Sequence, residues 1–66
     1  MKIEVGNIAE IEVGTGNYFM VQMTKEYKGG ASFYADVVEG GSGNHLFDFI
    51  QVRKVFTREK NPEYYL

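Results

Sequence analysis

Apolar and polar residues alternate along the first half of the chain, and nearly all the apolar positions there carry odd numbers. These odd-numbered apolar residues are Ile3, Val5, Ala9, Ile11, Val13, Phe19, Val21, Met23, Phe33, Ala35 and Val37. Successive side chains of a strand point to opposite faces of a sheet. Such alternation is therefore typical of strands with one buried face. We expect an all-β fold in which the odd-numbered side chains pack inward.

Glycine and asparagine cluster at residues 14–17, 29–30 and 40–44, between the alternating segments. These clusters favour turns, so each is expected to close an antiparallel hairpin. Facing residues of such a pair share one side of the sheet, which limits the registers. The expected facing pairs are Ile11 with Phe19, Val21 with Phe33 or Ala35, Val37 with Phe47, and Ala35 with Phe49.

The segment 45–56 breaks the odd-number pattern, because the apolar residues Ile50 and Val52 carry even numbers. Its apolar residues also scatter around a helical wheel, so an amphipathic helix does not explain it. A strand, one 3₁₀ turn at residues 48–51 and a last strand at residues 52–56 reconcile the pattern.

Residues 57–66 follow as a polar tail. Pro62 is expected to end any helical turn in this tail one residue before it, because proline restricts its predecessor.

Two segments of this chain resemble parts of the small SH3-like barrels. Residues 5–13, which read VGNIAEIEV, resemble the opening strand, and residues 45–56 resemble the closing strand, one-turn 3₁₀ helix and last strand. The resemblance implies a strongly bent antiparallel SH3-like barrel of about five strands over residues 1–56, closed so that no strand edge is exposed. The chain is also similar to short acidic barrels of phages and prophages, which implies a phage-encoded modulator or inhibitor of a host protein.

The chain has 66 residues, which fits one small domain. A hydrophobic share of 44% is too high for a disordered chain. The absence of cysteine fits a reducing compartment. The sequence shows neither a secretory signal nor an apolar run of membrane-spanning length, so we expect a cytoplasmic protein.

The residues available for catalysis are few, and we expect no enzyme. His45 is the only histidine, and neither Ser32 nor Ser42 has a histidine close in sequence. Asp36 and Asp48 would face each other in the expected register and could form an acid/base pair. Both alternate with buried neighbours, so two solvated carboxylates are the simpler interpretation.

The glycine-rich residues 40–44 could suggest a phosphate-binding loop, but no Gly-Lys-Ser/Thr follows them. A hairpin turn is the expected role. With one histidine and no cysteine, and without the spacing of a calcium loop, we expect no metal and no other cofactor.

Basic residues cluster near the end of the chain, at Arg53, Lys54, Arg58 and Lys60. Such a strip could bind the phosphates of a nucleic acid. The formal net charge of −2 opposes binding to a polyanion. Nucleic-acid binding is therefore the alternative prediction, beside the possibility that these cations pair with nearby carboxylates.

The side chains that alternate with the expected core are unusually apolar. Tyr18, Met20, Tyr34 and Val38 would point outward, and the expected registers make them one contiguous patch with Asp36 at its rim. Exposed aromatic and methionine side chains often mark interaction sites. We therefore predict a non-enzymatic protein-interaction module that binds a partner protein or a second copy. Alternatively, the tail residues Tyr64, Tyr65 and Leu66 could fold back over the patch.

Overall fold

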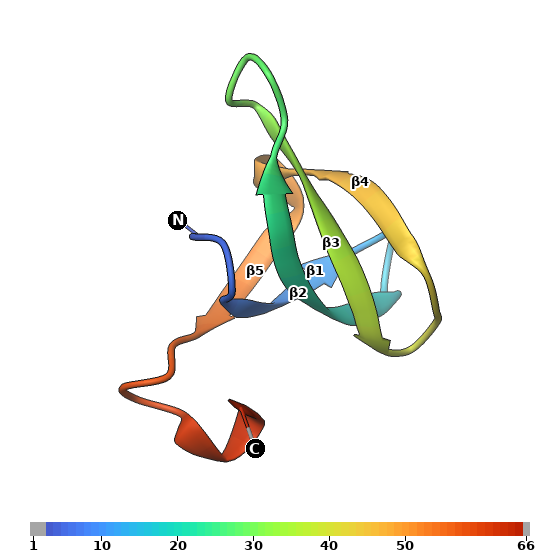
Figure 1. Ribbon diagram of the computed structural model, residues 1–66. Coiled ribbons are helices and arrows are strands. Elements are labelled where there is room, and N and C mark those ends of the chain that lie inside the picture. The colour runs from blue at the N-terminus through green and yellow to red at the C-terminus, as the bar shows by residue number, and fades with distance from the viewer. Residues whose placement is uncertain (1–2, 66) are drawn as a thin grey trace.

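The computed structural model describes residues 3–65, which form five strands and two short 3₁₀ helices (Figure 1). In chain order these are β1 (Ile8–Glu12), β2 (Tyr18–Glu26), β3 (Ser32–Glu39), β4 (Asn44–Asp48), η1 (Phe49–Gln51), β5 (Val52–Phe56) and η2 (Pro62–Tyr65). The expected all-β class and the 3₁₀ turn before the last strand are confirmed. No helix among residues 3–65 combines the length and the apolar character needed to cross a membrane.

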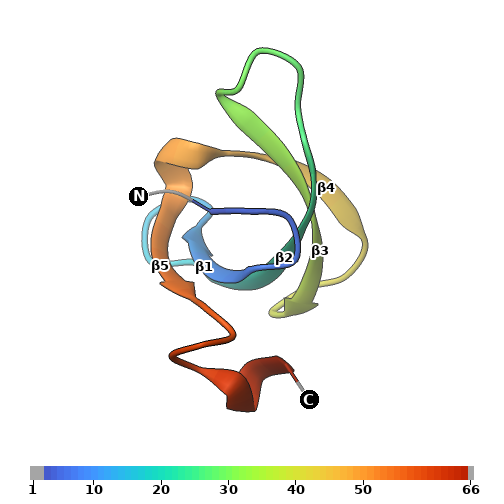
Figure 2. The same ribbon diagram turned by 60° about the vertical axis from the view of Figure 1, so that its left-hand side comes forward.

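The strands form one antiparallel sheet in the order β4-β3-β2-β1-β5. The sheet bends strongly, and its two edge strands, β4 and β5, follow one another in the chain and are joined by η1 (Figures 1 and 2). Within the described residues no ladder joins β4 to β5. The expected closure of all strand edges is therefore wrong, because η1 turns the chain between the two edges instead of pairing them.

The inner face of the bent sheet carries the core, as the alternation predicted. The buried core cluster consists of Ile3, Ala9, Ile11, Val21, Met23, Phe33, Ala35, Val37, Phe47 and Val52. Two positions depart from the pattern. Val5 is 62% exposed, because Asn7 N–H donates to the Glu4 carbonyl and forms a turn before β1 begins. Ile8 is buried although it has an even number, because it lies beside the folded-back tail.

The first hairpin has the predicted register, with Ile11 facing Phe19. Its loop ends at Gly16, whose φ of 79° favours glycine. The registers predicted for the next two hairpins are wrong: Val21 faces Val37 and Phe47 faces Phe33.

Two features of the strands explain these different registers. Two irregularities in the pairing of β2 with β3 shift their register. In β4, the ring of Phe47 packs 6.1 Å from that of Phe33 across the ladder. The pairing expected between Ala35 and Phe49 does not form either, because the strand ends at Asp48 and Phe49 begins η1.

Gln51 connects η1 to both sides of the sheet. Its Oε1 accepts a hydrogen bond of 2.8 Å from the backbone N–H of Asp48, at the end of β4. Its Nε2 donates over 3.3 Å to the Glu12 carbonyl at the end of β1. The side chain thus stabilises the turn that carries the chain from one edge strand to the other.

The tail folds back against the sheet through two aromatic residues. A turn closed by the Asn61 N–H and the Thr57 carbonyl ends before Pro62, as predicted. A second turn, η2, then begins at Pro62, where the fixed φ of proline suits a first helical position. Leu66, which the sequence groups with Tyr64 and Tyr65, lies outside the described residues.

Tyr65 and Tyr64 hold η2 against the end of β1 and β5. The Tyr65 hydroxyl accepts from the Ile8 N–H over 2.7 Å and donates to the Phe56 carbonyl. Ile8 and Phe56 face each other across β1 and β5, so the hydroxyl bridges the last rung of that ladder. The ring of Tyr64 packs with its centre 4.5 Å from that of Phe56.

Candidate protein-docking surface

The five residues predicted to form a docking surface all lie on β2 and β3, and they alternate with core residues there. Tyr18 and Val38 are 49% and 52% exposed, and Asp36 is exposed as well. Met20 and Tyr34 are partly buried. The structure divides these residues between two places, because the register of β2 with β3 differs from the expected one.

Met20 faces Glu39, next to Val38, whereas Tyr34 faces Lys25 near the other end of the hairpin. The prediction of one contiguous patch that contains both Met20 and Tyr34 is therefore wrong. Asp36 lies between the two places, opposite Gln22, and accepts a hydrogen bond of 3.0 Å from the Asn44 side chain.

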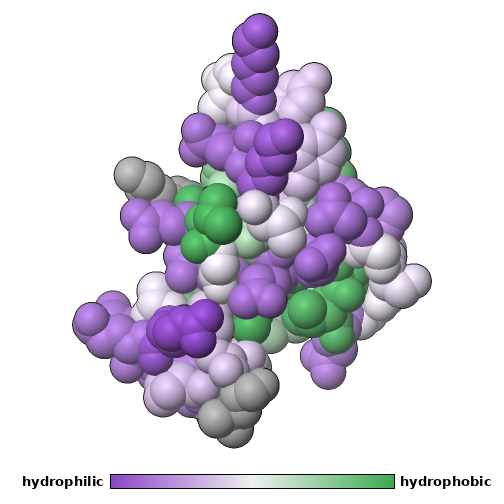
Figure 3. Space-filling view, viewed as in Figure 1, coloured by the Kyte–Doolittle hydropathy of each residue, from purple (hydrophilic) through white to green (hydrophobic). Residues whose placement is uncertain are grey.

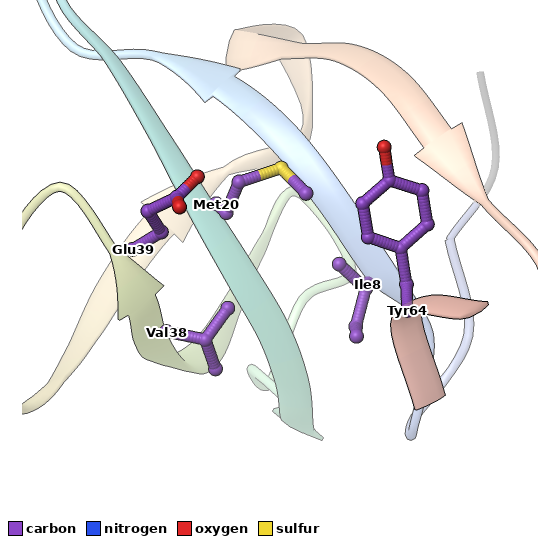
Figure 4. A pocket seen from close by; sticks show the side chains of 5 residues that line it. All are labelled: Ile8, Met20, Val38, Glu39 and Tyr64. Atoms are coloured by element: carbon purple, nitrogen blue, oxygen red, sulfur yellow. The ribbon is translucent and has the colours of Figure 1, made fainter. Parts of the chain in front are cut away.

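A groove lies at the end of the sheet that carries Met20. Its volume is about 180 Å³. It is lined by residues of β1, β2, β3 and η2, namely Ile8, Met20, Val38, Glu39 and Tyr64. Figure 4 shows the side chains of Ile8, Met20 and Val38 around a common space, with the Tyr64 ring beside Ile8. Figure 3 shows a hydrophobic area over this end of β2 and β3, bordered by hydrophilic side chains.

Three residues of this groove were not among the predicted site residues. Tyr64 was expected only as part of a tail that could cover the patch, and it forms one wall of the groove instead. Ile8 could have been recognised from the sequence, because it is an apolar residue at an even-numbered position, where side chains were expected to point outward. Glu39 gave none, since its place beside Met20 depends on the irregular register.

Carboxylates flank the apolar centre of the groove. Across the sheet, Met20 faces Glu10 on β1 and Glu39 on β3. Glu10 in turn faces Lys54 on β5. Met20 therefore lies in an apolar strip with a negative charge on either side, and this arrangement can bind an apolar side chain that has a cation beside it.

Tyr34 belongs to a second apolar cluster at the other end of the hairpin. Its ring lies 5.8 Å from the ring of Tyr27 in an edge-to-face arrangement. Across the β3–β4 ladder it faces Leu46, which is 47% exposed. Tyr34 therefore contributes to a surface near the edge strand β4 and not to the groove.

Three of the four predicted phosphate-binding cations have partners within the chain. Arg53 Nε lies 3.0 Å from Glu12 Oε1 in an ion pair. Lys54 Nζ lies 5.2 Å from the centre of the Phe56 ring, and Arg58 Cζ lies 4.5 Å from the centre of the Tyr65 ring. Lys60 is exposed on the turn before η2. Of these three side chains, Arg53 makes the expected pairing with a carboxylate, whereas Lys54 and Arg58 pack on aromatic rings.

Glu12 has a shifted titration on this side of the molecule. Its carboxylate accepts a hydrogen bond of 3.0 Å from the Gly16 N–H and a second from Arg53 Nε. Both donors favour the charged form, so the Gly16 N–H and then Arg53 lower the pKa of Glu12.

The expected pairing of two aspartates is wrong, because Asp36 faces Asn44 and Asp48 faces Ser32. The Ser32 hydroxyl donates to Asp48 over 2.8 Å. His45 Nε2 lies 2.8 Å from the Ser42 carbonyl oxygen, so this ring nitrogen is engaged with its own turn.

The remaining chemical features also belong to turns. The glycine-rich residues close the hairpin between β3 and β4, through a 2.9 Å bond from the Val37 N–H to the Gly43 carbonyl. Across residues 3–65 no three metal-binding side chains come together.

Comparisons of the chain with protein-family models, with curated proteins and with solved structures found no match.

Proposed function

We propose that this chain is an SH3-like interaction module that binds a partner protein through the groove around Met20. The observation that carries the proposal is the convergence of Ile8, Met20, Val38 and Tyr64 at one exposed end of the sheet. Tyr18, two residues before Met20 on β2, extends the same outward face. Apolar side chains in a hollow, surrounded by polar residues, are the usual centre of a protein interface.

The chemistry of the groove specifies the partner further. An apolar anchor side chain would fill the space between Met20 and Val38, and a lysine or arginine next to it would approach Glu10 or Glu39. The resemblance to phage barrels makes a host protein the partner class that we propose, with inhibition or adaptation of that protein as the outcome of binding.

Nucleic-acid binding through the basic strip remains the second prediction. Arg53, Lys54 and Arg58 would each have to leave an intramolecular partner to reach a phosphate. This cost, together with the net charge of −2, favours the groove over the strip.

The test compares two variants that add the same charge at exposed valines. Val38→Lys places an ammonium group in the groove, whereas Val5→Lys places one on the N-terminal turn. In affinity capture from the native host, Val38→Lys is expected to weaken retention of the specific partner by about tenfold or more. Val5→Lys is expected to retain it as the unaltered chain does.

Equal retention by both variants would remove the groove from the proposal. A parallel titration with short DNA and RNA duplexes at about 20 mM salt tests the strip. Binding there that is abolished by Arg53→Glu and unaffected by Val38→Lys would establish the alternative.

A further inference from the structure

The free edge of β4 presents backbone groups that point away from the sheet. β4 is a terminal strand, and it lies at the outer side of the molecule in both ribbon views (Figures 1 and 2). The bonds from Val37 N–H to the Gly43 carbonyl and from Phe49 N–H to the Ala31 carbonyl show which rungs are hydrogen-bonded. In an antiparallel ladder such rungs alternate. The odd residues of β4 therefore bond to β3, and the N–H and C=O groups of Asn44 and Leu46 point toward the free edge. The Asp48 N–H also lies on that side, where it already donates to Gln51 Oε1 over 2.8 Å.

Apart from the Gln51 side chain bonded to the Asp48 N–H, the described residues place no covering group on this edge. Edge strands are commonly protected by lysine, proline or a covering segment. The strand β4 reads NHLFD and has no lysine, arginine or proline. The other edge strand, β5, reads VRKVF and carries Arg53 and Lys54. Leu46, at the centre of β4, is instead an exposed apolar side chain.

We propose that β4 pairs with β4 of a second copy of this chain, in an antiparallel two-fold dimer centred on Leu46. The proposal concerns a different surface from the groove and does not depend on it. In this register Leu46 faces its own copy, Asn44 faces Asp48, and His45 faces Phe47. The N–H and C=O groups of Leu46 in each copy bond to those of the other copy, because this residue belongs to the rungs that point outward.

The sequence of β4 fits a second copy because no facing pair of residues in the dimer carries two like charges. Asp48 is the only carboxylate in β4, and in the dimer it faces the neutral Asn44, with the second Asp48 at the far end of the strand pair. Like charges directly opposite each other would destabilise such a pair. In an isologous interface the same surface must be complementary to itself. Both the charges and the backbone groups of β4 satisfy this requirement.

On the outer face of the dimer, the apolar cluster around Tyr34 in one copy meets the same cluster in the other copy. Tyr27, Tyr34 and Leu46 form this cluster in each copy, and Leu46 lies at the strand edge nearest the axis. Contact of the two leucines continues the cluster across the axis and removes their exposed surface from water. The interface is small, so the dissociation constant is expected to be on the order of 100 µM.

A single introduced cysteine tests the register directly, because the chain has none of its own. In a hydrogen-bonded antiparallel pair, facing Cα atoms lie about 5.5 Å apart, which is within the range that a disulfide spans. Under oxidised glutathione, Leu46→Cys is expected to form a disulfide-linked dimer at least about tenfold faster than Val5→Cys. The two sites have comparable exposure, so their ratio reports the geometry.

Sedimentation of the full chain between about 10 µM and 1 mM provides the second measurement. Leu46→Pro removes an N–H that points away from β3, and proline is tolerated at such edge positions. Leu46→Lys places two like charges face to face. Both variants are expected to remain monomeric where the unaltered chain dimerises, and Val38→Lys is expected to dimerise normally.

Equal cross-linking rates for Leu46→Cys and Val5→Cys would overturn the proposal. A monomer at every concentration, or a dimer that survives both Leu46→Pro and Leu46→Lys, would overturn it as well. A dimer that is lost only with Val38→Lys would show that the groove is occupied by a second copy, and this result would contradict both the β4 proposal and the proposed partner.

Discussion

The two edge strands of this sheet differ in what surrounds them. At β5, Tyr64 and Tyr65 of the tail pack against the strand end, and Arg53 forms an ion pair with Glu12 of the neighbouring strand. At β4, Leu46 is exposed, and the backbone groups of alternate residues point away from the sheet. The comparison indicates that the tail packs against one edge strand, while the other edge strand keeps an exposed leucine and outward-pointing backbone groups at its centre.

The difference follows from the position of η1 between the two edge strands. The strand β5 is followed by enough residues to fold back, because the tail of residues 57–65 begins at its end. The strand β4 leads directly into η1 and then into β5, so the described residues that follow it continue along the opposite edge of the sheet. An open sheet of this topology therefore protects its two edges unequally.

The largest effect should come from shortening the aromatic residue that supports each edge strand. Phe56 on β5 and Phe47 on β4 are both 6% exposed. Replacing either by alanine should lower the free energy of unfolding by about 3 to 5 kcal/mol, as measured by urea denaturation. Phe56→Ala should cost more than Phe47→Ala, because it also removes the contact with Tyr64.

Leucine in place of either phenylalanine gives a milder pair of variants if the alanine forms do not fold. The expected order is the same in that pair. A larger loss at position 47 than at position 56 would show that the tail does not stabilise β5.

A smaller effect is expected from the Tyr65 hydroxyl alone. Tyr65→Phe leaves the Ile8 N–H and the Phe56 carbonyl without their bridge. The free energy of unfolding should fall by about 1 to 3 kcal/mol, the usual cost of unpaired polar groups. The matched control is Tyr18→Phe, which removes the hydroxyl of a half-exposed tyrosine and should change stability by less than about 0.5 kcal/mol. Equal effects of the two changes would contradict the bridging role.

The smallest effect concerns the charged link between β5 and β1. The pKa of Glu12 is lowered in the folded chain, first by the Gly16 N–H and then by Arg53. A lowered pKa means that the unfolded chain binds the proton more readily. The stabilisation is therefore present above the ordinary value of 4.5 and is lost as the pH falls through the folded value.

Urea denaturation between about pH 5 and pH 3 measures this loss. Glu12→Gln should make the decline in stability with falling pH shallower than in the unaltered chain. Arg53→Gln should do so only in part, because the hydrogen bond from Gly16 remains. A decline unchanged in Glu12→Gln would show that other carboxylates account for it.

The odd or even number of a strand residue predicted whether it is buried, but it did not predict the register between neighbouring strands. The period of two settles the face of a side chain, so Phe33, Ala35 and Val37 were placed correctly in the core. A shift by any even number of residues keeps every side chain on its face. Facing Phe47 to Val37 or to Phe33 therefore satisfies the same pattern, and the structure has the second arrangement.

The predicted grouping of the site residues depended on the same registers. Where the short loop at Gly14 and Gly16 left one choice, the pairing of Ile11 with Phe19 was predicted correctly. Where irregularities interrupt the β2–β3 ladder, Tyr34 and Met20 were assigned to one patch although the two lie near opposite ends of that ladder. The tail contact joins the Tyr65 hydroxyl to the backbone N–H of Ile8, 57 positions away in the sequence, and no local pattern specifies it.

The Tyr65 bridge also provides a reporter in the backbone of β1. The amide proton of Ile8 can exchange with solvent deuterium only when the tyrosine oxygen withdraws, so its exchange rate measures the opening of the tail. Because Ile8 also lines the groove, the same proton would register a ligand that closes over that hollow. A single resonance thus follows tail opening and occupancy of the groove without any label on a partner.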